Sequence, residues 1–138
     1  MPAVAPCGAP ASEQRAAAQT YRSVKSLDDV RAAMTAATAA GKPVMLEFYA
    51  DWAPFCQVMH REVFPDARVQ TLLAKLVWLR ADVTANDATD KALLKPFGVT
   101  GVPQILFFRR DGQQRKDLLL AGYSKPEDLV QRLEQALR

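Results

Sequence analysis

The sequence has few cysteines and few histidines. It contains two cysteines, Cys7 and Cys56, and a single histidine, His60. Two cysteines cannot form the network of disulfides that staples small secreted domains. This count excludes a disulfide scaffold, but it does not indicate a cellular compartment.

Long apolar runs and runs of one charge are also missing. The longest apolar segments, 44–50 and 102–108, are interrupted by Glu47, Pro103 and Gln104, and neither approaches the roughly 18 to 20 residues of a membrane span. Residues 1–20 lack a charged segment followed by an apolar one, so we expect no signal peptide. The net charge of +3 is spread along the chain without a run of five like charges, and we therefore expect no nucleic-acid binding.

What remains is the composition of one globular domain. Hydrophobic residues make up 49% of the chain and charged residues 24%, as in ordinary folded domains. Residues 1–20 are rich in Ala and Pro without apolar periodicity, which predicts a flexible tail or linker. We interpret Cys7, which lies there, as an incidental thiol. Regular patterning over 21–138 predicts a single domain.

The patterning beyond residue 20 alternates helices with strands. Strands are predicted at 21–24, 44–49, 76–81, 103–109 and 114–121. Helices are predicted at 26–40, 54–62, 67–74, 86–95 and from 124 onward, with Ser26, Asp66 and Ser124 as N-caps and Glu127 completing a capping box. We interpret the Asn86–Asp87 pair as a helix cap. The order predicts an α/β fold with parallel strands first and an antiparallel pair last.

The segment ADWAPFC at 50–56 lies where a central strand gives way to a helix. Thiol–disulfide chemistry uses two cysteines separated by two residues at such a helix start, because the free N–H groups and the positive end of the helix dipole stabilise a thiolate. Cys56 occupies the second position and Ala53 the first. Taken alone, a single cysteine in a helix is most often a small buried hydrophobic residue.

Three further features favour a redox site over that simpler interpretation. Trp52 directly precedes the motif, Glu47 lies in the strand leading into it, and Gly101-Val102-Pro103 opens the next central strand. Proline at the first residue of an interior strand is rare unless its peptide bond is cis and serves a site. We therefore expect a cis bond between Val102 and Pro103.

The motifs YADW at 49–52, VTAND at 83–87, GVPQILFF at 101–108 and DGQ at 111–113 resemble those of the C-terminal, periplasmic thioredoxin-like domains of the DsbD family of bacterial thiol:disulfide interchange proteins. The resemblance covers residues 21–138. It implies a thioredoxin fold, in which helices flank a central mixed β-sheet.

The resemblance also implies a function. Such a domain is a periplasmic electron carrier, tethered to the inner membrane through its parent protein. It receives electrons from the transmembrane domain and passes them to the N-terminal periplasmic domain, which serves disulfide reduction and cytochrome c maturation. The resemblance implies no metal and no cofactor, and we expect a monomer.

Residue by residue, Cys56 matches the resolving cysteine and Ala53 falls on the attacking one, which predicts an inactive chain. The Ala is either an engineered substitution or the mark of a natural, redox-dead paralogue; the otherwise maintained site favours the first. Two other functions stay open: a non-catalytic interaction module with a thioredoxin fold, and a free-standing periplasmic thioredoxin.

The other site residues follow from the same comparison. Glu47 matches a buried acid that exchanges a proton with Cys56, and burial should raise its pKa; the alternatives are a solvent-facing side chain or a salt bridge. His60, one helical turn after Cys56, departs from the family pattern, in which an acidic residue is expected, and is either incidental or tunes the site. The partner surface is predicted to comprise Trp52, Pro54, Phe55, Val102 and Pro103.

Overall fold

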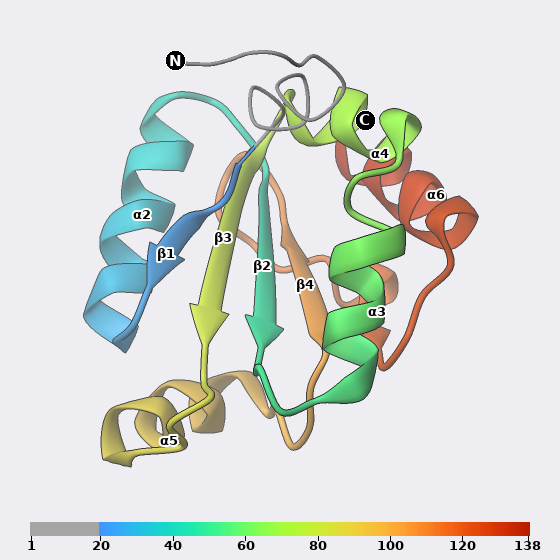
Figure 1. The fold of residues 1–138 in the computed structure, drawn as a ribbon. Helices are drawn as coiled ribbons and strands as arrows, with labels where there is room; N and C mark the ends of the chain where they lie inside the picture. The colour runs from blue at the N-terminus through green and yellow to red at the C-terminus, as the bar shows by residue number, and fades with distance from the viewer. Residues whose placement is uncertain (1–19) are drawn as a thin grey trace, which may run out of the picture.

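A mixed five-stranded sheet forms the centre of the computed structural model, which describes residues 20–138 (Figure 1). The predicted tail, including Cys7, lies outside the described residues apart from Thr20. The strands are β1 (Arg22–Val24), β2 (Val44–Tyr49), β3 (Val77–Asp82), β4 (Gln104–Phe108) and β5 (Leu120–Ala121), in the order β1-β3-β2-β4-β5. The pairs β1–β3 and β2–β3 are parallel, whereas β2–β4 and β4–β5 are antiparallel. The predicted fold class is confirmed.

Helices cover both faces of this sheet. Helices α2 (Leu27–Ala39) and α5 (Ala88–Leu94) lie on one face, and α3 (Pro54–Glu62), α4 (Ala67–Leu73) and α6 (Pro126–Ala136) lie on the other (Figure 1). Two short 3₁₀ helices, η1 (Lys95–Phe97) and η2 (Lys116–Leu118), connect the elements. No helix among residues 20–138 is long and apolar enough to cross a membrane.

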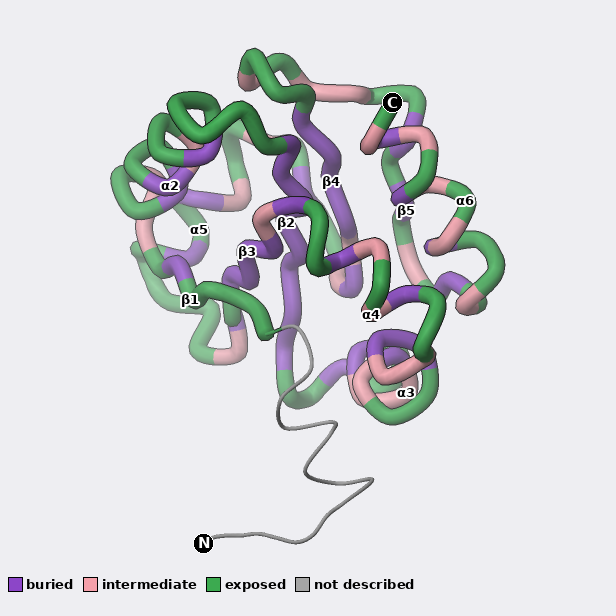
Figure 2. The backbone as a smooth tube through the Cα atoms, turned by 90° about the horizontal axis from the view of Figure 1, so that it is seen from above, coloured by how far each residue is buried: buried purple, intermediate pink, exposed green. Residues whose placement is uncertain are grey.

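The sheet separates two apolar cores, because successive side chains of a strand point to opposite faces. Leu46, Leu79 and Leu106 pack with α2 on one face, whereas Met45 and Phe107 pack with α3, α4 and α6 on the other. Figure 2 shows the central strands buried along most of their length. This double cover explains why the strand at 44–49 is almost continuously apolar.

Helix starts follow the predicted capping chemistry with one exception. Ser26 and Asp29 form a capping box on α2, Asp66 caps α4, and Asp87 caps α5. The prediction for Ser124 is wrong, because the N-cap of α6 is Lys125 and no side chain caps it.

The reason is Pro126, which takes the first helical position and drives the residue before it into extended backbone. Ser124 therefore lies one residue before the N-cap position, where its side chain is buried. The predicted capping box with Glu127 does not form; the carboxylate of Glu127 instead accepts a hydrogen bond from Arg68.

The predicted final strand at 114–121 is also interrupted. Only a single bridge pairs Gln114 with Phe108 before the chain turns through η2 and resumes as the two-residue β5. The turn packs Leu118 into the core beneath α6. An ion pair between Arg115 and Asp117 lies across the same turn. Local packing therefore replaces most of the expected hairpin ladder, which survives only at Gln114 and in β5.

Candidate functional site

The site is built where β2 ends and α3 begins. Ala53 is the N-cap of α3 with extended backbone, and Pro54 takes the first helical position. The Ala53 N–H donates to the Ala50 carbonyl at 3.2 Å, and the Ala53 carbonyl accepts from the N–H groups of Cys56 and Gln57 at 3.1 and 3.2 Å. No side chain caps this helix. Pro54 has no N–H group and those of Cys56 and Gln57 are bonded to Ala53, so the Phe55 N–H and the positive end of the helix dipole remain to stabilise an anion.

Cys56 lies one turn inside α3 and is 1% exposed. Burial raises the pKa of the Cys56 thiol; the carboxylate of Glu47 acts in the same direction, whereas a backbone hydrogen bond at Ala50 and the charge of Arg80 oppose it. The negative charge of Asp82 also raises the pKa of the Cys56 thiol. A raised pKa leaves less thiolate at neutral pH and makes Cys56 a weaker nucleophile, as suits the second position of the motif.

The turn that precedes the helix is held by a hydrogen-bond network. The Tyr49 hydroxyl donates to Asp51 Oδ1 at 2.7 Å, and Gln57 Nε2 donates to Tyr49 Oη and to the Asp51 carbonyl. Across the site, Thr84 Oγ1 accepts from the Asp51 N–H at 2.9 Å, and the Thr84 carbonyl accepts from Trp52 Nε1 at 3.1 Å. Two loops that are distant in sequence are thereby fixed to each other.

The start of β4 lies beside this turn. Register pairs Phe48 near the end of β2 with Gln104 at the start of β4, and the Val102–Pro103 bond is cis as predicted. Pro103 is buried, and its carbonyl accepts from the Gly122 N–H at 2.8 Å. Half-buried Val102 lines a hollow of about 220 Å³ together with Trp52, Val83, Asn86, Leu94, Val99, Thr100 and Gly101.

Exposed aromatic rings surround the turn. Trp52 is 62% and Phe55 57% exposed, and Pro54 is exposed between Ala53 and Phe55. The sequence analysis missed Tyr123, which is 40% exposed and whose ring centroid lies 5.9 Å from that of Phe55. No spacing in the sequence connects Tyr123 to the motif; the long-range contact between the β4 start and Gly122 brings it there.

A buried ion pair lies beneath the site. Glu47 is 2% and Arg80 3% exposed. Arg80 Nη2 approaches Glu47 Oε1 at 2.9 Å and Oε2 at 3.2 Å, Arg80 Nε donates to Oε1 at 3.0 Å, and Trp78 Nε1 donates to Oε1 at 2.9 Å. Glu47 is therefore buried, as a proton-exchanging acid would be, and is also held in a salt bridge. The sequence analysis missed Arg80, although a lone Arg inside the apolar strand at 76–81 was an available signal.

Aromatic rings enclose the Arg80 guanidinium. Its carbon lies 3.9 Å from the ring centroid of Tyr21, 4.6 Å from that of Tyr49 and 5.4 Å from that of Trp78. Cation–π attraction and the carboxylate together compensate a charge that would otherwise be costly to bury. Burial raises the pKa of Glu47, as expected, while the charge of Arg80 and the Trp78 indole oppose that rise.

His60 is half-buried against the same cluster. Its ring centroid lies 4.9 Å from that of Tyr49 and 5.8 Å from that of Phe64. Burial, followed by the nearby charge of Arg80, lowers the pKa of His60 to about 4, so the imidazole is neutral at pH 7. Its Nε2 atom is buried without a hydrogen-bond partner among the described residues. Within residues 20–138, no three His, Cys, Asp or Glu side chains are placed to hold a metal ion.

Comparison with known proteins identifies relatives of this arrangement. A family model described as a thioredoxin-like domain matches residues 30–137. The chain is 46% identical over 117 residues to the thiol:disulfide interchange protein DsbD of Ralstonia nicotianae, covering 85% of this chain and 19% of that protein. DsbD of Escherichia coli K12 is 43% identical over 107 residues, covering 78% of this chain and 19% of that protein. The chain thus spans about a fifth of the length of these relatives.

Solved structures agree with the sequence matches. The C-terminal domain of Neisseria meningitidis DsbD in its oxidised form superposes with a TM-score of 0.70 at 31% identity, covering 83% of this chain and 99% of that one. A thioredoxin from Thermus thermophilus superposes with a TM-score of 0.67 at 25% identity, covering 85% and 87%. The chain therefore belongs to the thioredoxin-like family, as a domain of the kind that forms the C-terminal part of DsbD, and this family membership implies a thiol–disulfide oxidoreductase role.

Proposed function

We propose that this chain is the periplasmic electron-relay domain of a DsbD-type parent protein, in a form in which Ala53 occupies the position of the attacking cysteine. The observation that carries the proposal is the strand–turn–helix geometry. Ala53 occupies the N-cap position of α3, where no side chain caps the helix, and Cys56 lies buried one turn further along. These are the positions that an attacking and a resolving cysteine require.

With a cysteine at position 53, the exchange proceeds in two steps. The thiolate at position 53 attacks a partner disulfide, which forms a mixed disulfide and releases one partner thiolate. The Cys56 thiol then loses its proton and attacks the sulfur at position 53, which releases the second partner thiolate and leaves a 53–56 disulfide. Two electrons pass to the partner. Glu47 lies in the strand beneath and is the proposed acceptor of the Cys56 proton; the charge of Arg80 opposes the rise that burial causes in the pKa of Glu47 and so favours the carboxylate that can accept.

The proposed electron donor is the transmembrane domain of the same parent protein, and the proposed acceptor is its N-terminal periplasmic domain. Disulfide reduction and cytochrome c maturation lie downstream. The chain spans about a fifth of its curated relatives, which supports a domain of a larger protein. The parent protein would tether it at the periplasmic side of the inner membrane.

The proposed partner surface comprises Trp52, Pro54 and Phe55 with the Val102–Pro103 segment. The exposed rings of Trp52 and Phe55 supply apolar area, and Tyr123 enlarges it through its contact with Phe55. Because Pro103 is buried, we expect it to shape this surface while Val102 contacts the partner. Small interfaces of this kind suit transient redox encounters.

The test of the proposed function is Ala53→Cys. This variant should form an intramolecular disulfide with Cys56 under mild oxidation and should reduce a disulfide substrate when electrons are supplied. Ala53→Ser is the matched control, since it adds a side chain of similar size without a thiol. Two free thiols after oxidation of Ala53→Cys, counted with Cys7 replaced by Ser, would show that the assigned geometry is wrong.

Ala53 itself favours a second candidate, a docking module that binds partners without exchanging disulfides. The exposed aromatic surface is intact without the attacking sulfur. The present chain should therefore bind the N-terminal domain of its parent reversibly, with a dissociation constant in the micromolar range or weaker. NMR titration measures this, with Trp52→Ala as the weakened control. Absence of binding at millimolar concentration would exclude the docking module.

A further inference from the structure

A group of arginines lies at the end of the sheet opposite the Ala53–Cys56 turn. Strand register pairs Phe108 at the end of β4 with Val44 at the start of β2. Arg109 and Arg110 therefore leave the sheet at the end far from the redox turn.

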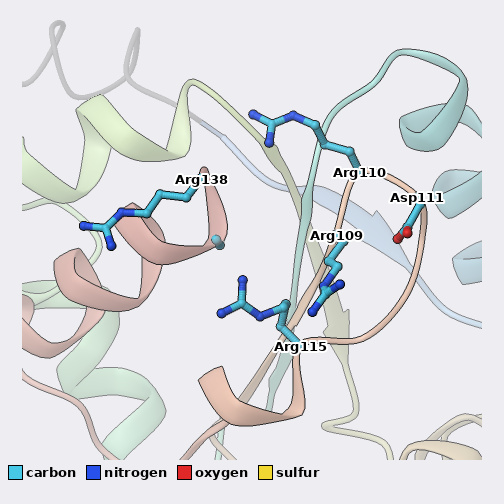
Figure 3. A pocket seen from close by; sticks show the side chains of 6 residues that line it. Arg109, Arg110, Asp111, Arg115 and Arg138 are labelled. Carbon is cyan, nitrogen blue, oxygen red and sulfur yellow. The ribbon is translucent and has the colours of Figure 1, made fainter.

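Two more arginines come from other segments: Arg115 follows the turn after β4, and Arg138 follows α6 (Figure 3). The four side chains line a hollow of about 340 Å³ together with Asp111 and Ala136. A neighbouring hollow shares Arg110 and Arg138 and adds Lys75 and Glu134.

Within residues 20–138, only one of these four arginines forms an ion pair. Arg115 forms two hydrogen bonds with the carboxylate of Asp117, at 3.0 and 2.8 Å. Arg110 Nη2 donates to the carbonyl of Leu137 at 3.2 Å, which carries no charge. In the described part of the chain, no carboxylate lies within 4.0 Å of a nitrogen of Arg109, Arg110 or Arg138.

The hollow brings four arginines together with one carboxylate, Asp111, that forms no ion pair with them, so the excess positive charge would be stabilised by an anion that occupies the hollow. Each guanidinium presents a planar fork of donors that pairs with two oxygens of a carboxylate or phosphate. Three such forks, two from the consecutive residues Arg109 and Arg110 and one from Arg138, exceed the two oxygens of a carboxylate. A phosphate group carries more acceptor oxygens, arranged tetrahedrally, and more charge.

We propose that this end of the sheet is a binding site for a phosphate group, held by Arg109, Arg110 and Arg138 around the hollow. The group is either free inorganic phosphate or part of a phospholipid headgroup, which present the same oxygens. The site shares no residue with the redox turn and lies at the opposite end of β2 and β4. Occupation should therefore leave the thiol chemistry unchanged.

The first experiment titrates the full chain with sodium phosphate at constant ionic strength and follows the arginine Nε–Hε signals by NMR. Saturable shifts are expected. The dissociation constant for phosphate that they give should be at least tenfold higher in the triple variant Arg109→Gln, Arg110→Gln, Arg138→Gln. The matched control, Arg22→Gln, Arg31→Gln, Lys91→Gln, removes the same charge from exposed positions elsewhere and should bind as the parent chain does. Circular dichroism establishes that both variants fold.

The second experiment distinguishes a lipid headgroup from free phosphate as the source of the bound phosphate group. It measures sedimentation of the chain with vesicles of phosphatidylglycerol or of phosphatidylcholine. Binding to phosphatidylglycerol vesicles that the triple variant loses and the control keeps assigns the site to a lipid headgroup. Saturable binding of phosphate without vesicle binding assigns it to free phosphate. The proposal is overturned if neither ligand binds, if chloride reproduces the phosphate shifts, or if both variants lose binding equally.

Discussion

Arginine appears in two opposite settings at the two ends of this domain. Beneath the redox turn, Arg80 is 3% exposed, bonded to both oxygens of Glu47 and enclosed by aromatic rings. At the far end, Arg109, Arg110 and Arg138 are exposed and have no carboxylate within ion-pair distance among the described residues. A buried charge requires its partner within the fold because desolvation is expensive, whereas water solvates a surface charge until a ligand arrives. The first setting therefore serves the site from within, and the second is suited to binding from outside.

The largest difference should appear in stability. Glu47→Ala leaves Arg80 buried without its carboxylate, and we expect a loss of about 3 to 5 kcal/mol in the free energy of unfolding. Arg110→Ala at the other end should change it by no more than about 0.5 kcal/mol. Urea unfolding measures both. Replacing the pair together, as Glu47→Leu with Arg80→Met, should recover much of the loss, and equal effects of the two single substitutions would contradict the comparison.

The next effect concerns the thiol. Glu47→Gln removes a negative charge near Cys56 while Arg80 stays charged, so the pKa of Cys56 should fall. The pH profile of alkylation measures it in a Cys7→Ser background, which leaves one thiol. Adding Arg80→Met should reverse the fall.

Unfolding of a variant would also lower the pKa of Cys56, because it would remove the burial that raises it. A thermal melt of each variant shows whether the variant is folded at the temperature of the alkylation experiment. The arginine-end substitution Arg109→Gln is the matched control and should leave the alkylation profile unchanged. A fall in Glu47→Gln that Arg80→Met does not reverse would show that the ion pair does not act on Cys56.

His60 should make stability depend on pH. Its folded pKa of about 4 lies below the ordinary value of 6.5, so between these pH values the unfolded chain binds more protons than the folded one. Stability is therefore full above about pH 6.5 and falls as the pH drops towards 4. The loss should be about 1 kcal/mol once solvent access to a half-buried ring is allowed for.

Unfolding curves at pH 4.5 and 7 test this, with His60→Gln expected to remove that part of the pH dependence. Because Arg80 also lowers the pKa of His60, the double variant Glu47→Leu, Arg80→Met should shrink the effect. An unchanged pH dependence in His60→Gln would assign it to other groups.

The smallest effect should come from the exposed arginines. Arg109→Gln relieves repulsion at the far end and should raise the free energy of unfolding by a few tenths of a kcal/mol at low ionic strength, as is typical of surface charges. The gain should vanish in about 1 M sodium chloride, where the Debye length is about 3 Å. The Glu47–Arg80 pair, being buried, should be insensitive to the same salt. A gain for Arg109→Gln that persists in high salt would not be electrostatic.

Much of the fold was predictable because it follows from local patterns. The apolar run at 44–49, the cap at Ser26 and the proline at 103 each predicted an element or bond that the structure contains. The failures were also local. Pro126 shifted the α6 cap to Lys125, and the packing of Leu118 broke the last strand, since in both places neighbouring residues competed for one backbone conformation.

At the candidate site, the sequence indicated the motif residues and the cis Val102–Pro103 bond, but it did not indicate Arg80 or Tyr123. Cys56, Ala53 and Glu47 lie within ten residues and could be read together from one segment. Arg80 comes from another strand and Tyr123 from a loop. The sequence around a single Arg or Tyr does not show which residues its side chain will contact. Burial of Cys56 was predictable from its position one turn into a helix that covers the sheet.

The sequence by itself determined the order of helices and strands, the strand–turn–helix that holds Ala53 and Cys56, and the family resemblance, because these depend on periodicity, caps and motifs within short stretches of chain. Only the tertiary structure decided that Arg80 faces Glu47, that Tyr123 joins Phe55, and that four arginines gather around one hollow. Each of these depends on which residues become neighbours across the sheet. Strand order and register set those neighbours, and they are fixed only when both apolar cores form together.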